Sequence, residues 1–297
     1  MEQANAIELK NITKRFGEVV ANDSVDLSVK HGEILSVLGE NGSGKTTLMN
    51  MISGIYFPDE GQIFVDGEEV SICSPKDSFA LGIGMIHQHF KLVDVLTAAE
   101  NIILGLEGKS VLDMKKVVQD IQEVTERYGF ELDPNQKIYD MSVSQKQTVE
   151  IVKMLYRGAN ILILDEPTAV LTPQETEKLF TVLRNMRDQG KSIIIITHKL
   201  NEVLALSDRV SVLRKGKYIG TVETKNATAE SLTEMMVGEK IDLNIERPDP
   251  VNPVKRLVIE NLSCVNKEGV KTLKNASMEA YGGEILGIAG IAGSGQK

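Results

Sequence analysis

A glycine-rich segment near the start of the chain contains the residue types needed to hold a phosphate. It fits the pattern G-x-x-x-x-G-K-[ST] followed by one more threonine, and it reads Gly39, Glu40, Asn41, Gly42, Ser43, Gly44, Lys45, Thr46 and Thr47. Glycines at these positions let successive backbone N–H groups turn towards phosphate oxygens. Lys45 is placed to reach the β- and γ-phosphates, and the Thr46 hydroxyl to ligate Mg²⁺. The segment therefore predicts a nucleotide-binding loop.

Two adjacent carboxylates, Asp165 and Glu166, end the apolar run at 161–164. An apolar strand delivers such residues to the carboxyl end of a sheet, where folds of this kind bind their ligands. Asp165 suits the coordination shell of Mg²⁺. Glu166 suits the water that attacks the γ-phosphate, as a base or as a positioning group, and a positioned base contributes about 10²–10⁴ in rate. With the glycine-rich segment upstream, the pair predicts hydrolysis of a bound nucleotide.

The elements around these residues are predicted from hydrophobic spacing and turn residues. Continuous apolar runs at 159–165 and 191–197 are typical of strands covered on both faces, and a helical pattern at 173–190 lies between them. Strand, helix and strand in alternation predict a parallel sheet in an α/β fold. The other predicted elements are strands at 24–29 and 32–39, helices at 45–54, 112–130, 144–158 and near 228–238, and hairpins at 61–70 and 209–223.

The order and spacing of the motifs resemble those of the nucleotide-binding subunit of an ABC transporter, over essentially all 297 residues. The resemblance implies a P-loop NTPase fold of the ABC ATPase type that binds ATP and Mg²⁺. Such a fold has a mixed sheet core, an antiparallel β subdomain and a helical signature subdomain, expected here at about 90–157. In this family two halves pair head to tail, and each ATP lies between the phosphate loop of one half and the signature of the other.

The same resemblance assigns roles to residues outside the glycine-rich segment. Gln88 matches the Q-loop, which touches the metal and reports to the membrane subunit, and His198 matches the switch histidine at the γ-phosphate. Phe16 matches the aromatic residue that stacks on adenine. MSVSQKQ at 141–147 occupies the place of the LSGGQ signature, and LDEPTAVLTPQE at 164–175 resembles the metal strand and D-loop. The implied site comprises catalytic Lys45, Gln88, Glu166 and His198, metal-binding Thr46, Gln88 and Asp165, and, besides the glycine-rich segment, nucleotide-binding Phe16, Ser142, Ser144 and Gln145.

The beginning of the chain is repeated near its end. Residues 241–256 contain three prolines and no helical periodicity, which predicts an extended linker. After it, HGEILSVLGENGSGK at 31–45 returns as GGEILGIAGIAGSGQ at 282–296. We therefore expect a first nucleotide-binding domain at 1–240, a linker at 241–256, and at 257–297 the start of a second, truncated and degenerate nucleotide-binding domain.

Both copies depart from the family pattern at residues that belong to the same composite site. The signature has Val143 and Ser144 where the family has two glycines, and the Ser144 side chain hinders close approach of the backbone to phosphate. In the second copy Gln296 stands in the position of Lys45, and removal of one such electrostatic interaction typically costs about 3–4 kcal/mol. We therefore expect an asymmetric ATPase, in which the site built on the first glycine-rich segment is the working one.

Charge and hydropathy restrict the partners of the chain. The formal net charge is −9, and an acidic chain is a poor general binder of nucleic acid, because that affinity rests on Lys and Arg. We therefore expect no nucleic-acid partner. The longest apolar runs are far shorter than the roughly 20 residues of a membrane-spanning helix. Any membrane crossing must therefore be made by another chain.

By resemblance, the chain powers import of a nucleoside or simple sugar. The segment HQHFKLVDVLTAAENIILG is closest to the nucleoside branch, and residues near 88–105 are the expected docking surface for integral membrane permease subunits. Further expected partners are an extracellular solute-binding (lipo)protein, indirectly, and a second nucleotide-binding half in cis or in another copy. The expected location is the cytoplasmic face of the cell membrane, as a peripheral subunit. Two alternatives stay open: a soluble ABC-type ATPase without a transport role, and a fragment that binds ATP without hydrolysing it.

Overall fold

The computed structural model describes residues 5–88, 90–106, 113–239, 253–265 and 271–290. The chain forms two compact units, Met1–Ile241 and Asp242–Lys297. Most of the expected linker, at 241–252, lies outside the described residues. The second glycine-rich segment, with Gln296, also lies outside them.

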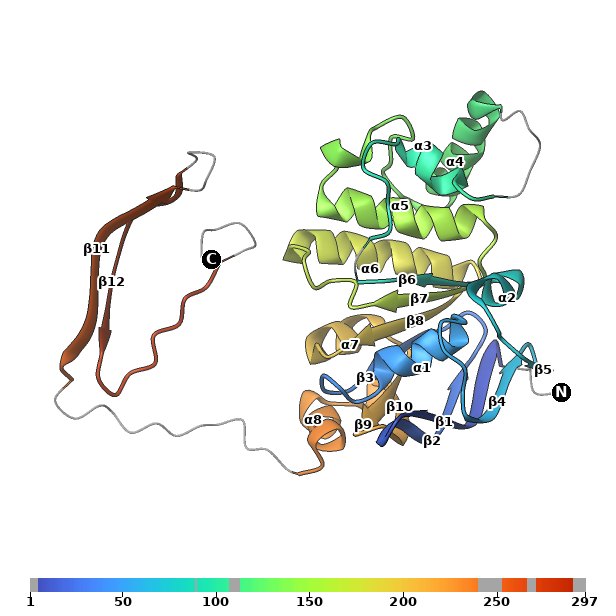
Figure 1. Cartoon of the computed structure of the whole chain (residues 1–297), viewed down its shortest axis with the longest axis horizontal. Helices are drawn as coiled ribbons and strands as arrows, with labels where there is room; N and C mark the ends of the chain where they lie inside the picture. The colour runs from blue at the N-terminus through green and yellow to red at the C-terminus, as the bar shows by residue number, and fades with distance from the viewer. Residues whose placement is uncertain (1–4, 89, 107–112, 240–252, 266–270, 291–297) are drawn as a thin grey trace. The chain divides into compact units, whose positions relative to one another are not determined.

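A six-stranded sheet forms the centre of the first unit (Figure 1). Its strands are β3 (Ile34–Leu38), β6 (Ile83–Ile86), β7 (Ile161–Asp165), β8 (Ser192–Thr197), β9 (Arg209–Arg214) and β10 (Lys217–Glu223). Their order is β10-β9-β3-β8-β7-β6. Neighbours are parallel from β9 to β6, and β10 is antiparallel to β9. The expected α/β fold with a mixed sheet core is therefore confirmed.

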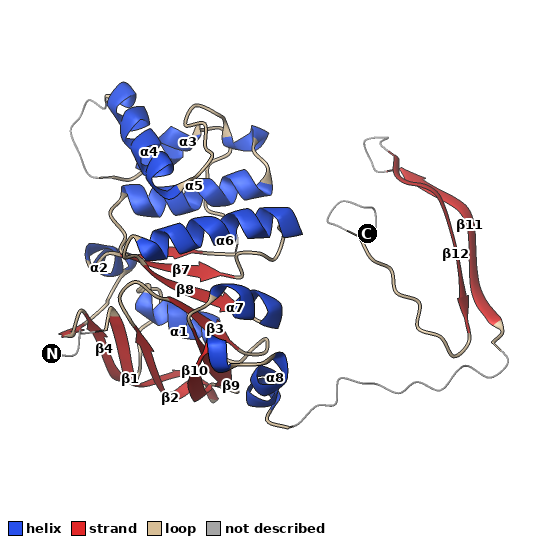
Figure 2. Ribbon diagram, turned by 180° about the vertical axis from the view of Figure 1, so that it is seen from behind, coloured by secondary structure: helices blue, strands red, loops and turns tan. Residues whose placement is uncertain are grey.

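Helices cover both faces of this sheet (Figure 2). They are α1 (Lys45–Ile52), α2 (Pro75–Ala80), α5 (Val143–Tyr156), α6 (Pro173–Asp188), α7 (Leu200–Leu206) and α8 (Ala229–Val237). Successive residues of β8 face opposite sides of the sheet. Ile194 and Ile196 share a buried cluster with α1, whereas Ile193 and Ile195 share one with α5 and α6. The continuous apolar run in β8 is explained by this burial on both faces.

A four-stranded antiparallel sheet forms the expected β subdomain. Its strands are β1 (Ile7–Phe16), β2 (Val19–Val29), β4 (Glu60–Val65) and β5 (Glu68–Val70), in the order β2-β1-β4-β5. The hairpin predicted at 61–70 is β4 and β5. Its turn residues Asp66 and Gly67 have φ of 53° and 84°, the left-handed values that a two-residue type I′ turn requires.

A helical layer packs on α5, on the side of α5 away from α6 in Figure 1. It contains α3 (Ala98–Ile103), α4 (Met114–Tyr128) and the short 3₁₀ helix η1 (Ile138–Asp140). Ile102, Ile121 and Val149 belong to the buried cluster that joins these helices to α5. The layer occupies the segment where the helical signature subdomain is expected.

In the second unit, β11 (Lys255–Val265) and β12 (Lys271–Tyr281) form an antiparallel hairpin. Most of its described side chains are exposed. The hairpin repeats β1 and β2 in detail: Asn11 and Asn261, 250 residues apart, both have left-handed φ, 53° and 50°. The repeat seen in the sequence is thus also a repeat of local backbone conformation.

Candidate functional site

The glycine-rich segment joins β3 to α1 and passes very close to two other strands. Gly44 has a left-handed φ of 94° and directly precedes α1. A Cβ at Gly44 would lie 2.4 Å from the carbonyl oxygen of Ala21, and one at Gly39 would lie 2.3 Å from that of Leu213. Only glycine fits these two positions without displacing the backbone. The loop is thereby held between β2 and β9 with the N-terminus of α1 at its end, where backbone N–H groups favour an anion.

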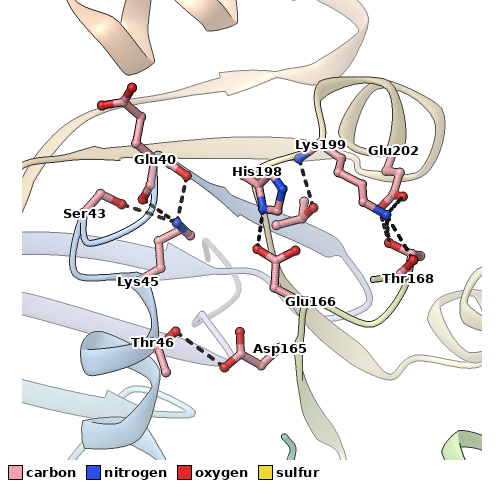
Figure 3. Close-up of polar contacts among 12 residues, drawn as sticks. Glu40, Ser43, Lys45, Thr46, Asp165, Glu166, Thr168, His198, Lys199 and Glu202 are labelled. Atoms are coloured by element: carbon pink, nitrogen blue, oxygen red, sulfur yellow. Dashed lines mark hydrogen bonds and ion pairs between the residues drawn. The ribbon is translucent and has the colours of Figure 1, made fainter. Parts of the chain in front are cut away.

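Lys45 is held inside the loop by the loop's own carbonyl groups (Figure 3). Its Nζ donates hydrogen bonds to the carbonyl oxygens of Gly39 at 2.7 Å and Glu40 at 2.8 Å. The residue is 6% exposed. Burial lowers the pKa of the Lys45 ammonium, while the carboxylates of Glu166 and Asp165 act in the opposite direction. The ammonium therefore lies among acceptors that a phosphate oxygen can replace.

Asp165, at the end of β7, reaches the start of α1. The Thr46 hydroxyl donates to Asp165 Oδ2 at 3.4 Å. Burial raises the pKa of Asp165, and the like charge of Glu166 raises it further. Mg²⁺ bound with a nucleotide usually takes one or two side chains and completes its shell with phosphate oxygens and water. Thr46 and Asp165 offer such a pair of oxygen ligands, so the residues present fit this metal.

Glu166 and His198 face each other across the ends of β7 and β8 (Figure 3). His198 Nδ1 lies 2.8 Å from Glu166 Oε1, and the two side chains are 48% and 12% exposed. The second carboxylate oxygen of Glu166, Oε2, is buried and has no hydrogen-bond partner among the described residues. A buried acceptor without a donor fits a position that a water molecule occupies. The arrangement suits Glu166 for accepting a proton from water or orienting it.

A cleft of about 750 Å³ collects these groups. Its lining comes from the start of β2, the glycine-rich segment, the ends of β7 and β8 and the turn between β9 and β10. The lining residues are Val19, Val20, Ala21, 41–47, Gln88, Asp165, Glu166, Ala169, Ile196, His198, Lys215 and Gly216. Gln88 also lines a neighbouring cavity of about 80 Å³, together with Asp165 and Glu166. The structure thus brings Lys45, Thr46, Gln88, the carboxylate pair and His198 to one place.

Lys215 lines the cleft although no pattern in the sequence predicts a role for it. It is exposed, has a φ of 50°, and forms the β9–β10 turn with Gly216. The N–H of Gly216 donates to the carbonyl oxygen of Ser43 at 3.2 Å, which joins the turn to the glycine-rich segment. The sequence predicts the hairpin at 209–223. It does not predict that the hairpin contacts the glycine-rich segment about 170 residues earlier, because no local pattern encodes that contact.

Phe16 ends β1 and does not line the cleft. It is 44% exposed and packs edge-on with Tyr56, with ring centroids 5.2 Å apart. Lys14 Nζ lies 5.5 Å from the Phe16 ring centroid. The ring is thus a partly exposed aromatic surface in contact with Tyr56 and Lys14, and its contact with adenine stays a prediction.

The signature residues lie away from the phosphate loop of the same chain. Ser142 caps α5: its Oγ accepts from the N–H of Gln145 at 3.3 Å, and Gln145 Oε1 accepts from the N–H of Ser142 at 2.9 Å. Ser144 and Gln145 line a different groove, of about 580 Å³, between α5, α6 and the loop after α4. A role for Ser142, Ser144 and Gln145 in nucleotide binding therefore requires a phosphate loop from elsewhere.

The comparison with known proteins agrees with this geometry. Residues 22–169 match the family model described as ABC transporter. The chain is 48% identical, over its full length and 59% of the relative, to the nucleoside import ATP-binding protein NupA of Lactococcus lactis subsp. cremoris. It is 47% identical, over 98% of the chain and 57% of the relative, to the guanosine import ATP-binding protein NupO of Bacillus subtilis. The chain thus spans somewhat more than half the length of these curated relatives.

Solved structures resemble about three quarters of the chain. The ADP conformation of MJ1267, an ATP-binding cassette of an ABC transporter, matches with a TM-score of 0.70 and 26% identity, over 79% of this chain and 99% of that one. The dimeric structure of MJ0796, a bacterial ABC transporter cassette, matches with a TM-score of 0.63 and 28% identity, over 73% of this chain and 98% of that one. In the described part of the chain, no helix combines the length and apolarity needed to cross a membrane.

Proposed function

We propose that this chain, which belongs to the ATP-binding cassettes of ABC transporters, binds Mg²⁺–ATP and hydrolyses it to drive import of a small solute. One observation carries the proposal: Lys45, Asp165, Glu166 and His198 line a single cleft, although they come from three separate parts of the chain. That combination of ammonium, metal ligand, proton acceptor and imidazole is the set that phosphoryl transfer to water needs.

Each residue has a distinct proposed role. Lys45 exchanges the carbonyl groups of its own loop for the β- and γ-phosphates. Thr46, Asp165 and Gln88 would hold Mg²⁺, which would supply positive charge to neutralise the phosphate oxygens. Glu166 orients the attacking water and accepts its proton. His198, already held by Glu166 Oε1 at 2.8 Å, contacts the γ-phosphate.

The position of the signature supports pairing of two nucleotide-binding halves. Ser144 and Gln145 line a groove separate from the phosphate cleft, so they reach a nucleotide only across an interface. We propose that this interface forms with a second half, in cis or in another copy. Because Val143 and Ser144 replace glycines and Gln296 replaces the loop lysine, the site containing Lys45 is the one proposed to hydrolyse ATP.

The proposed cargo is a nucleoside, with a simple sugar as the alternative, and the support is the naming of the relatives NupA and NupO. The proposed permease contact is at 88–105. There Val93 and Val95 are 40% and 69% exposed. Tyr139, which is 60% exposed, lies beside them, because its N–H donates to the carbonyl oxygen of Asp94 at 3.2 Å. A permease docked there, with a solute-binding lipoprotein outside, places the chain at the cytoplasmic face of the membrane.

Nucleotide binding is the direct test. In titration calorimetry with Mg²⁺–ATP, we expect Lys45→Met to weaken binding by about 10²- to 10³-fold, since removal of one such electrostatic interaction costs about 3–4 kcal/mol. Glu166→Gln should bind as the wild type does and lose hydrolysis by about 10²-fold or more. Lys217→Met, at the start of β10 and outside the cleft lining, is the control. A wild-type chain without Mg²⁺-dependent affinity for ATP contradicts the proposal.

Uptake tests the cargo. Cells that produce the chain together with its permease should accumulate labelled guanosine, and cells with Lys45→Met should not. Accumulation of ribose without guanosine would favour the sugar alternative, and normal uptake of both in the Lys45→Met cells would exclude a role in import.

A further inference from the structure

A second polar cluster, formed by Thr168, Lys199 and Glu202, lies beside the phosphate cleft (Figure 3). Lys199 Nζ donates to the carbonyl oxygen of Thr168 at 3.0 Å, to Thr168 Oγ1 at 3.1 Å and to Glu202 Oε1 at 2.9 Å. The Thr168 hydroxyl in turn donates to Glu202 Oε2. The cluster joins the loop after β7 to the loop after β8 and the first turn of α7.

The cluster does not touch the nucleotide cleft. None of its three residues is among those that line the cleft or the cavity beside Gln88. Thr168 is 2% exposed, and the Glu202 side chain is 17% exposed. The charge of Lys199 is compensated by Glu202 within the cluster. The cluster therefore ties the loop after β7 to the loop after β8. Any effect on the reaction must pass through residues of these two loops.

The neighbours are the two residues that face each other at the site. Lys199 directly follows His198, and Thr168 lies two residues after Glu166. Glu166 has a left-handed φ of 48°, a conformation that persists in a non-glycine residue only when the surroundings enforce it. The His198 side chain is about half exposed, so its contact with Glu166 is open to competition from water. Fixing the backbone on both sides keeps this contact in place.

We propose that Thr168, Lys199 and Glu202 are positioning residues that hold His198 against Glu166. The inference rests on the proposed hydrolysis of ATP at this site. It assigns to the cluster an effect on the rate of hydrolysis and none on nucleotide affinity. Gln147 supports the same loop from α5, where its Nε2 donates to the carbonyl oxygen of Pro167 at 2.8 Å.

Lys199→Met keeps the length of the side chain and removes the ammonium. We expect the rate of hydrolysis per bound nucleotide to fall about 10-fold or more, while the Kd and stoichiometry of Mg²⁺–ATP stay within about threefold of the wild type, because the Lys199 ammonium lies outside the cleft. Lys225→Met, which removes an exposed ammonium after β10 that also pairs with a carboxylate, is the matched control. Thr168→Val should act in the same way as Lys199→Met, and Thr168→Ser, which keeps the hydroxyl, should recover most of the rate.

A double-variant cycle separates positioning from general destabilisation. If Lys199 acts through His198, then Lys199→Met should change the residual rate of His198→Ala by less than about twofold, since coupled residues are not additive. An equal loss in the wild-type and His198→Ala backgrounds overturns the inference. So does a Lys199→Met or Thr168→Val protein that hydrolyses ATP as the wild type does.

Hydrogen exchange tests whether the cluster fixes the loop after β7, even if the chain does not hydrolyse ATP. The amides of Ala169 and Leu171 donate to the carbonyl oxygens of Glu166 and Thr168. Peptides covering 166–172 should exchange about 10-fold faster in Lys199→Met and in Thr168→Val, and their exchange should be unchanged in Lys225→Met. Equal exchange in all of these variants overturns the inference. Absence of hydrolysis in a wild-type chain that binds Mg²⁺–ATP overturns only the proposed activity.

Discussion

At the scale of single residues, the cleft that contains Lys45, Asp165 and Glu166 brings partly buried charged groups close together. Burial raises the pKa of Asp165 and the like charge of Glu166 adds to this effect, whereas burial lowers the pKa of Lys45. Glu166 Oε2 has no donor among the described residues. Each of these groups is more favourably placed once a cation and a phosphate are present. We therefore expect binding of a metal ion and a phosphate to stabilise the folded chain.

Replacing the carboxylate of Asp165 should stabilise the folded chain when no nucleotide is bound. Because the pKa of Asp165 is raised on folding, the folded chain holds this proton more tightly than the unfolded chain, and stability falls as pH rises through the window between the two pKa values. Asp165→Asn removes this loss of stability, because asparagine does not ionise. At neutral pH we expect its Tm to rise by about 2–4 °C, the change that roughly 1 kcal/mol produces in a domain of this size.

The pH dependence checks the sign of this effect. Calorimetry of wild type and Asp165→Asn should show the difference in Tm shrinking as the pH falls towards the ordinary range of an aspartate. The Mg²⁺ dependence of ATP binding should be lost in the variant and should weaken in the wild type at low pH. A variant that melts below the wild type at neutral pH contradicts the argument.

Lys215 should add to the affinity for nucleotide. It lines the cleft and makes no described ion pair, whereas Lys217 in the same hairpin pairs with Asp23 at 3.2 Å and lies outside the lining. We expect Lys215→Met to weaken Mg²⁺–ATP binding about threefold, as for a partly exposed charge, and the difference to shrink at high salt. Lys217→Met is the control. Equal affinities for the two variants at low salt exclude the contact.

The residues of the site differ in how far their sequence context predicts them. Local patterns of a few residues predict four of them: a glycine-rich turn predicts Lys45 and Thr46, and the end of an apolar strand predicts Asp165 and Glu166. Lys215 has no such pattern, because its place in the cleft comes from the packing of a distant hairpin against Ser43. The Thr168 cluster is likewise formed only when neighbouring strands bring two loops together.

At the scale of elements, α5 connects separate parts of the site. Its first turn carries the signature residues, Gln147 binds the loop after Glu166, and Glu150 accepts the N–H of Lys91 at 2.8 Å, in the loop after β6. Burial lowers the pKa of Lys153 and Arg157, and the carboxylate of Glu150 opposes this in both. The helix that begins at the predicted signature thus makes hydrogen bonds to both of these loops.

Neutralising Glu150 should destabilise the chain. The residue is 6% exposed, and Glu150→Gln removes the carboxylate that opposes the effect of burial on Lys153 and Arg157. We expect the free energy of unfolding in urea to fall by about 1–3 kcal/mol. Glu123→Gln, on the exposed side of α4, should change it little. Coincident unfolding curves for Glu150→Gln and the wild type would show that α5 does not depend on this contact.

Element length and regularity of pairing decide how well the sequence predicted the fold. The helix expected at 173–190 is α6, Pro173–Asp188, because Thr172 and Glu175 form a capping box and Gly190 follows its end. In contrast, β6 has four residues and α3 has six, too few for a periodic pattern to emerge. β1 was not predicted as a strand either, and its pairing is irregular around the left-handed Asn11.

At the scale of the whole molecule, the two units differ in how completely they bury apolar side chains. Every described residue of the four buried hydrophobic clusters belongs to the first unit. In the second unit, β11 and β12 leave Leu257, Val258 and Leu262 at least 41% exposed. An isolated two-stranded hairpin is marginally stable in water. The cooperative unfolding of the chain should therefore be that of the first unit.

Truncation after Ile241 tests this division. Because all of the described core lies before that residue, we expect the shortened chain to melt within about 2 °C of the full chain, a change that corresponds to less than about 1 kcal/mol. Its Mg²⁺–ATP affinity should be unchanged, since every lining residue of the cleft is retained. Calorimetry and titration with the same nucleotide measure both. A large fall in Tm would mean that the second unit contributes to the stability of the first, and a loss of affinity alone would mean that it contributes to the nucleotide site.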